Sequence, residues 1–187
     1  MATRREFLRA GGLTLAGLAL PPWLARAARE GGALPAAGRV VEIRMRSDAR
    51  GGTVWFDPIG VRVAAGTTVR WVLEAGAHSA TAYHPANGNR APRIPAAAVP
   101  WDSGMLIEPG QTFEQRLVVP GVYDYFCLPH EMAGMVGRIV VPGDGDGRDM
   151  VEPAPGGDEF RALPAAALAA FPSIDRILEA GAVRRHA

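Results

Sequence analysis

The stretch that most constrains this chain is residues 123–137, because it places three candidate metal ligands within nine residues. Cys127 is the only cysteine in the protein, His130 follows three positions later, and Met135 five positions after that. Strand-like runs lie on both sides of this loop. A thiolate and an imidazole, joined by a second imidazole and a weak axial thioether, form the ligand set of a blue-copper electron-transfer site. The pattern predicts a mononuclear copper site, with His78 as the candidate second histidine.

The N-terminus has the composition of a targeting segment. Residues 3–8, Thr-Arg-Arg-Glu-Phe-Leu, resemble the twin-arginine export motif, and the small residues Ala25 and Ala27 offer a cleavage site. The apolar run at 11–20 is shorter than the roughly 20 residues of a membrane-spanning helix. We therefore predict that residues 1–27 are a twin-arginine signal peptide. The mature protein should be periplasmic, with no stable membrane span after leader cleavage.

Export gives the single cysteine a particular meaning. Cysteines in oxidising compartments usually form disulfides, but one cysteine cannot form a disulfide within its own chain. A bound metal would keep the Cys127 thiolate deprotonated and occupied. The formal net charge of the chain is only +1, so its charge gives no indication of a partner. In particular, it favours neither nucleic acid nor an anionic membrane surface.

Short alternating runs with turn residues between them fill the middle of the chain. In residues 67–74, Val69, Trp71 and Leu73 share one face of a predicted strand, and polar residues occupy the other. This pattern predicts an all-β sandwich of about seven or eight strands. The expected strands are residues 39–46, 53–56, 60–63, 67–74, 77–83, 111–119, 122–126 and 136–141.

The spacing Cys-x2-His-x4-Met after Gly-Val-Tyr-Asp-Tyr-Phe resembles the ligand loop of the cupredoxins, of the plastocyanin and pseudoazurin kind. The resemblance implies a Greek-key barrel with one copper at one end, held by His78, Cys127, His130 and Met135. It also implies a soluble electron carrier and not an enzyme. Redox partners such as a c-type cytochrome, an oxidase or a reductase would dock on an apolar patch around His130, formed by Leu128, Pro129, Met132 and Ala133.

Some ligand positions have competitors. Met132 is nearer to His130 than Met135 is, but it would need a tighter turn, whereas Gly134 gives the backbone freedom just before Met135. His84 is an alternative to His78, although six residues of extended strand would separate the two by roughly 20 Å. Ser79 stands where many cupredoxins have an asparagine that ties the two ligand loops together. His186 lies near the end of the chain and receives no role.

The composition of the remaining segments predicts where the folded domain begins and ends. Residues 28–38 are expected to be flexible, 39–142 form the cupredoxin domain with a loop insertion at 84–104, and 143–187 form a linker and a C-terminal helical tail. Ser173 is the predicted N-cap of that helix, whose apolar stripe is Ile174, Ile177 and Leu178. The stripe could pack on the sandwich, on a second copy, or on a redox partner.

Other functions fit the residue inventory less well. Copper oxidases and nitrite reductases need further histidine-rich copper centres, and the chain has four histidines in all. A binuclear copper site of the thiolate-bridged kind needs two cysteines. A periplasmic copper carrier or storage protein without a redox role is the alternative to the electron carrier, and an exposed, methionine-rich site would favour it.

Overall fold

The computed structural model describes residues 39–145, 147, 149–154 and 156–185. The predicted signal peptide at 1–27, the segment 28–38 and His186 lie outside these residues.

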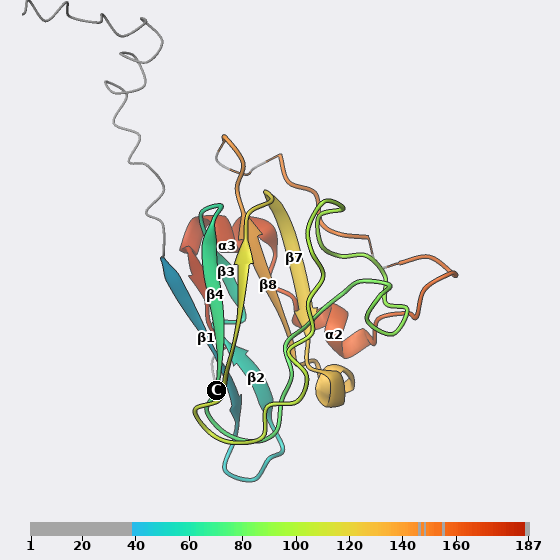
Figure 1. Ribbon diagram of the computed structural model, residues 1–187. Coiled ribbons are helices and arrows are strands. Elements are labelled where there is room, and N and C mark those ends of the chain that lie inside the picture. The colour runs from blue at the N-terminus through green and yellow to red at the C-terminus, as the bar shows by residue number, and fades with distance from the viewer. Residues whose placement is uncertain (1–38, 146, 148, 155, 186–187) are drawn as a thin grey trace, which may run out of the picture. The chain divides into compact units, whose positions relative to one another are not determined.

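Two β-sheets form the body of the described part of the chain, and short helices and loops lie around them (Figure 1). The four-stranded sheet has the order β2-β1-β4-β6, made of Val54–Asp57, Val40–Ser47, Thr67–Leu73 and Thr112–Leu117. The five-stranded sheet has the order β5-β7-β8-β3-β9, made of Thr81–Ala82, Gly121–Phe126, Val136–Val141, Gly60–Arg62 and Ala182–Val183. Parallel pairing of β1 with β4 and of β3 with β8 joins elements far apart in sequence. The predicted all-β sandwich is therefore confirmed.

The core lies between the inner faces of the two sheets. Val69, Trp71 and Leu73 on β4 are at most 1% exposed, which confirms the face predicted from their alternation. Trp71 packs on Tyr125 of β7, with ring centroids 5.2 Å apart, and on Trp101 of the insertion at 5.6 Å. The stiff ends of the strands carry the loops that hold the predicted ligands.

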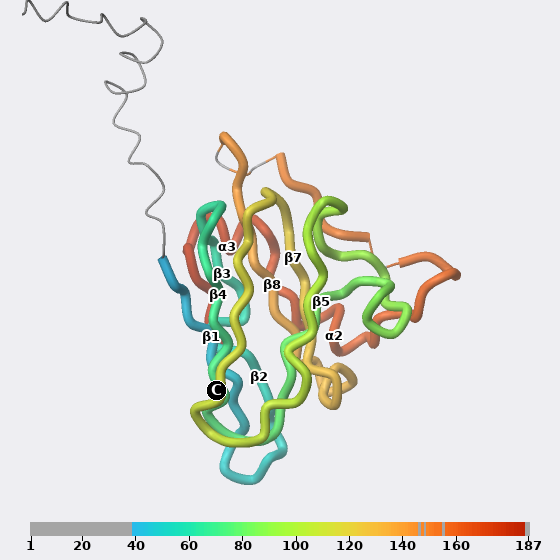
Figure 2. Tube along the Cα trace, in the orientation of Figure 1, coloured from blue at the N-terminus to red at the C-terminus, as the bar shows by residue number. Residues whose placement is uncertain are grey.

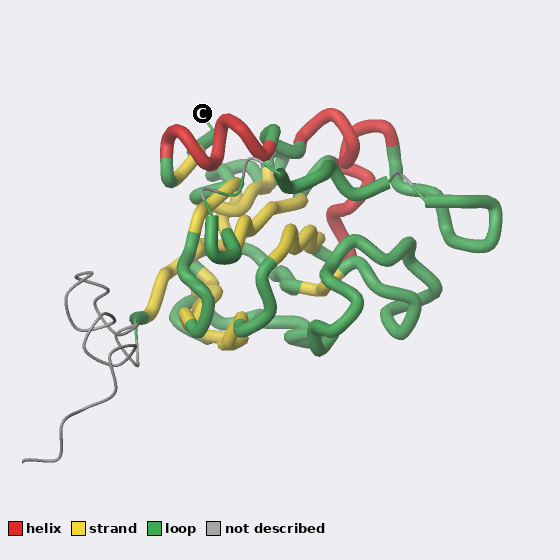
Figure 3. Tube along the Cα trace, turned by 90° about the horizontal axis from the view of Figure 1, so that it is seen from above, coloured by secondary structure: helices red, strands yellow, loops and turns green. Residues whose placement is uncertain are grey.

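The C-terminal tail packs on the sandwich, which decides among the alternatives for its apolar stripe. The helix α3 (Ile174–Ala180) begins at Ser173, whose hydroxyl accepts the Arg176 N–H, as a capping serine does. Ile177 is buried among Ile59, Val140 and Val183. Seen from above, the helices of the tail lie along one side of the strands (Figure 3).

Two elements of the tail were not predicted from the sequence. The helix α2 (Ala165–Ala170) is a run of alanines with one leucine, has no capping side chain, and is too short to be stable alone. Strand β9 has only two residues and pairs antiparallel with β3. Figure 2 shows the insertion as a green loop that approaches α2, and Arg90 of the insertion forms a parallel bridge with Arg161 of the tail.

A buried charge network attaches the insertion and the tail to the five-stranded sheet. Asp124 on β7 is fully buried and accepts hydrogen bonds from Arg93 of the insertion and from Arg138 of β8. Arg138 also pairs with Glu152 and donates to the Pro172 carbonyl. A carboxylate between two guanidinium groups satisfies charges that would otherwise be costly to bury.

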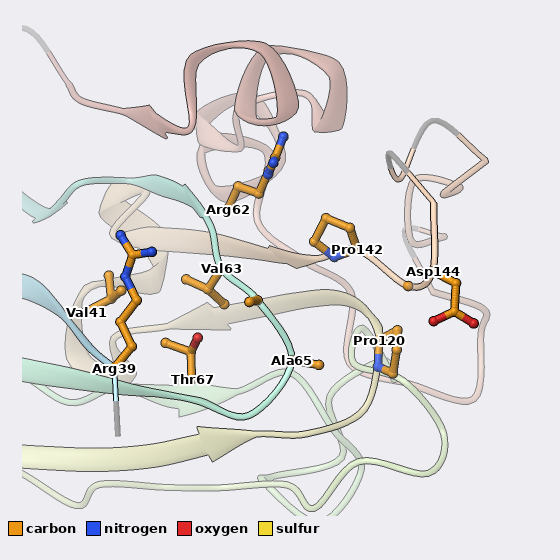
Figure 4. Close-up of a pocket in the computed structure, with 11 residues that line it drawn as sticks. Arg39, Val41, Arg62, Val63, Ala65, Thr67, Pro120, Pro142 and Asp144 are labelled. Carbon is orange, nitrogen blue, oxygen red and sulfur yellow. The ribbon is translucent and has the colours of Figure 1, made fainter. Parts of the chain in front are cut away.

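A pocket of about 500 Å3 opens at the end of the sandwich where β4 and β7 begin (Figure 4). It is lined by small and apolar residues together with Arg39, Arg62 and Asp144. The predicted ligands lie at the opposite end, beyond the last residues of β4 and β7. This pocket is therefore not part of the candidate site.

Candidate metal centre

Three of the four predicted ligands meet at one end of the sandwich. His78, Cys127 and His130 offer donor atoms that all lie within 4.8 Å of one another. The Nδ1 atoms of His78 and His130 are 3.1 Å apart, and the Cys127 Sγ lies 3.6 Å from the former and 3.4 Å from the latter. These atoms surround a common point, although the histidines are 52 residues apart in sequence.

The spacing of these donors suits one metal ion. Bonds of about 2.0 Å to nitrogen and about 2.3 Å to sulfur, as at zinc, would in a trigonal arrangement put the nitrogens about 3.5 Å apart and each nitrogen about 3.7 Å from the sulfur. The observed separations of 3.1, 3.6 and 3.4 Å are slightly shorter. A thiolate with two imidazoles in a trigonal set is a ligand type that copper accepts.

The loop between β7 and β8 has a compact shape that brings its ligands together. Leu128–Ala133 form one short 3-10 helix, η1, with Pro129 at its start. The Cys127 N–H donates to the Met135 carbonyl at 3.0 Å, and the Met135 N–H donates to the His130 carbonyl at 3.1 Å. Gly134 ends η1 with φ of 74°, and a Cβ there would lie 2.9 Å from the Ala166 carbonyl of α2. Glycine is therefore required by both the turn and the packing.

His78 is positioned by pairing with a distant segment. The expected strand at 77–83 is wrong in extent, because β5 contains only Thr81–Ala82. His78 instead forms an isolated antiparallel bridge with Leu106, just after the insertion. Its Nε2 lies 3.0 Å from the Ser47 hydroxyl at the end of β1. A hydrogen bond on one ring nitrogen leaves the other, Nδ1, free to face Cys127.

The competing residues have different environments. Met135 is completely buried, whereas Met132 is 71% exposed on the outer side of η1. His84 accepts the Ala86 N–H at its Nδ1 and is not in the cluster of donors found among the described residues.

Burial keeps the metal-free site neutral. It raises the pKa of the Cys127 thiol to about 11, against a lowering contribution from the Ser79 N–H. Burial, with a smaller contribution from neighbouring His130, lowers the pKa of His78 to about 4, and burial also lowers the pKa of His130. Both imidazoles are therefore neutral ligands at neutral pH, and a cation at their centre would stabilise the thiolate that burial alone disfavours.

A family model described as "Copper binding proteins, plastocyanin/azurin family" matches residues 43–142, which include all four predicted ligands. The chain belongs to this family. The match confirms the prediction of a cupredoxin, a copper electron-transfer protein with one copper per chain. It ends beside the last residue of β8, so the C-terminal tail lies outside it.

Individual relatives agree with the family assignment. The plastocyanin of Prochlorothrix hollandica is 32% identical over 110 residues, which are 58% of this chain and 78% of that protein. The plastocyanin of Scenedesmus fuscus is 31% identical over 100 residues, 54% of this chain and 99% of the relative. Among solved structures, pseudoazurin from Methylobacterium extorquens AM1 superposes with a TM-score of 0.50 and 22% identity, over 75% of this chain and 98% of that one. The last comparison supports the fold alone.

The cupredoxin's ligand loop rests on a buried cluster that sequence reasoning missed. Glu131, next to His130, is 2% exposed, and its Oε2 lies 2.6 Å from Arg90 Nη1 of the insertion. Tyr83 donates its hydroxyl to the other carboxylate oxygen at 3.0 Å, and Arg90 stacks on Phe126. The only sequence signal was a charged residue inside the ligand loop, and its partner lies 41 positions away. The ion pair between Arg90 and Glu131 thus holds the ligand loop against the insertion.

Ser79 joins the two ligand loops of the cupredoxin. Its backbone N–H points at the Cys127 sulfur at 3.3 Å, and its hydroxyl accepts the Leu128 N–H at 2.8 Å. The shorter serine side chain therefore makes a cross-loop contact of the kind expected from the asparagine of other members. Helices long and apolar enough to cross a bilayer do not occur in the described part of the chain.

Proposed function

We propose that His78, Cys127 and His130 are the equatorial ligands of a type 1 copper site and Met135 its axial ligand. The observation that carries this proposal is the convergence of one sulfur and two Nδ1 atoms within 4.8 Å. The complete burial of Met135 at the end of the same loop supports it as the fourth ligand over the exposed Met132. A bound copper supplies one-electron chemistry between Cu(II) and Cu(I).

The protein's own contribution is a rigid and dry binding site. Cys127, His78 and Met135 are completely buried, so water is kept from the sulfur side. The backbone bonds between Cys127, His130 and Met135 hold the loop in one shape. Because the ligands need little movement when an electron arrives or leaves, such a site suits fast electron transfer. It needs no substrate pocket, and we propose a carrier that is not an enzyme.

The proposed partner surface surrounds His130, which is partly exposed at the rim of the site. Leu128 is 43% and Met132 71% exposed, and Pro129 and Ala133 are exposed beside them. Met105 and Ile107 flank the residue that pairs with His78 and are also exposed. An apolar surface of this kind fits transient docking of a redox protein, such as a c-type cytochrome, an oxidase or a reductase.

We also propose that the mature protein works in the periplasm. The twin-arginine motif in residues 3–8 supports transport to the periplasm, followed by removal of residues 1–27. The alternative, a copper carrier or storage protein without a redox role, would be favoured by an exposed, methionine-rich site, whereas Cys127 and Met135 are fully buried.

The test is the spectrum and the redox titration of the purified protein with Cu(II). We expect intense visible thiolate-to-copper absorption, a narrow copper hyperfine splitting in spin resonance, and a reversible one-electron titration. Cys127→Ser should abolish the colour and leave the fold intact. A colourless Cu(II) complex of the wild type, or a copper that cannot be reduced and reoxidised, would reject the electron carrier in favour of the storage role. Turnover of nitrite or oxygen by the isolated protein would instead indicate an enzyme.

A further inference from the structure

The ligand loop is anchored by a charged residue. Of the six residues of η1, only Glu131 is buried, and the others are exposed or half-buried. Glu131 directly follows His130, and its carbonyl accepts the Gly134 N–H at 2.9 Å, one residue before Met135. A buried carboxylate is costly unless a positive group pairs with it. The position of both proposed ligands in this loop therefore depends on the partner of Glu131.

That partner comes from the insertion. Arg90 is 4% exposed, and its Nη1 lies 2.6 Å from the Glu131 Oε2. Its guanidinium also lies over the ring of Phe126, with the central carbon 4.8 Å from the ring centroid. Phe126 immediately precedes Cys127, and Glu131 immediately follows His130. One arginine side chain therefore contacts both flanks of the Cys-x2-His segment.

Arg90 is itself held by the tail and shielded from water. Its backbone forms a parallel bridge with Arg161, and the Arg161 N–H donates to the Asn89 carbonyl at 2.9 Å. The buried Tyr83 donates its hydroxyl to the second Glu131 oxygen at 3.0 Å, so both carboxylate oxygens have partners. Without Arg90, the Glu131 carboxylate would be more stable in solvent than in this buried place. Its departure would move η1.

We propose that Arg90 and Glu131 are positioning residues of the copper site, and that their ion pair holds His130 in its metal-binding place before the metal arrives. The inference rests on the proposed copper site, and it assigns a function to the 84–104 insertion. A loop that is held in place before binding needs no ordering when copper arrives, so this preorganisation raises the affinity.

Arg90→Met tests this role, because methionine keeps much of the apolar stem and removes the charge. We expect the affinity for Cu(I), measured by competition with a chromophoric chelator, to fall about 10–100-fold, the usual effect of losing a residue that orients a metal ligand. A second readout needs no metal. In the copper-free variant, the Gly134 and Met135 amide hydrogens, which donate within the loop, should exchange faster with solvent.

Arg93→Met is the matched control for both measurements. Arg93 is another buried arginine of the insertion, but its partners are Asp124 of β7 and the carbonyls of Pro153 and Ala154. The same substitution there should also destabilise the protein, and it should leave the copper affinity unchanged. The loop amides should exchange faster in Arg90→Met than in this control, which removes the contribution of global stability.

A Glu131→Gln background separates the ion pair from the packing of the arginine. Glutamine keeps an acceptor for the Tyr83 hydroxyl but has no charge. Arg90→Met then leaves no buried carboxylate unpaired, so it should lower the affinity far less than in the wild type. Should Arg90→Met fail to fold, Tyr83→Phe removes one donor to the same carboxylate and should lower the affinity about two- to tenfold.

The outcomes also separate this inference from the proposed function. If the wild type lacks the thiolate-to-copper absorption, the copper site is wrong, and this inference with it. If that absorption is present but Arg90→Met matches Arg93→Met in copper affinity and in amide exchange of the loop, only the positioning role is rejected. An equal effect of Arg90→Met with and without the Glu131 charge rejects it as well.

Discussion

Two methionines three residues apart have opposite surroundings in the ligand loop. Met135 is buried directly after the left-handed Gly134, and Met132 lies on the solvent side of η1. The sequence favoured Met135 by its spacing from His130 but left Met132 as a competitor. The reversal of the chain at Gly134 directs one side chain inward and leaves the other outside. Their difference in exposure makes the axial assignment testable at the level of single residues.

Met135→Leu should keep the visible colour and raise the reduction potential. Leucine retains the volume of the side chain but removes the weak sulfur ligand, which stabilises Cu(II) more than Cu(I). We expect a change on the order of tenfold in the ratio of reduced to oxidised protein, measured by redox titration. Met132→Leu is the matched control and should leave the potential unchanged. The axial assignment is wrong if the two variants exchange these results.

At the scale of elements, the tail and the insertion are more closely attached to the core than their loop-like composition indicates. The helix α3 packs on the five-stranded sheet, the strand β9 extends that sheet beyond β3, and α2 lies against the ligand loop at Gly134. Sequence periodicity predicted α3 and its cap. It could not predict α2 or β9, because such short elements are stable only where a neighbouring surface supports them.

Ile177→Ala should destabilise the whole domain without altering the copper spectrum. The side chain is completely buried between the tail and the sheet. A buried isoleucine truncated to alanine typically costs about 2–5 kcal/mol in the free energy of unfolding. Denaturant unfolding of the copper-free protein measures this change. Leu168→Ala, at a side chain 41% exposed on α2, is the control and should cost much less. A loss of stability confined to the tail would show that the tail folds independently of the sandwich.

At the scale of the whole molecule, one carboxylate joins parts of the chain that are distant in sequence. Asp124 contacts Arg93 from the insertion and Arg138 from β8, and Arg138 continues to the tail through Glu152 and Pro172. The guanidinium groups of Arg93 and Arg138 also stack on the Phe171 ring, with their central carbons 5.1 and 5.0 Å from the ring centroid. The sandwich, the insertion and the tail should therefore unfold together.

Asp124→Ala should leave two buried guanidinium groups without their shared partner. Removing one member of a buried ion pair typically costs about 3–5 kcal/mol, because the remaining charge is uncompensated. Calorimetric or denaturant unfolding should report this loss as a single cooperative transition. Arg70→Ala breaks the exposed pair with Glu114 and is the control, with an expected change of about 0–1 kcal/mol. Equal effects of the two variants would mean that the buried network does not hold the molecule together.

The sequence alone determined the properties that depend on neighbouring residues. The spacing of Cys127, His130 and Met135 defined the ligand loop, and the alternation of Val69, Trp71 and Leu73 defined a core face, because a strand repeats every two residues. The tertiary structure decided which distant partners meet. His78 faces Cys127 because its backbone pairs with Leu106, and Glu131 can be buried because Arg90 reaches it from the insertion. Such contacts depend on how the sheets and loops come together, and no local pattern encodes them.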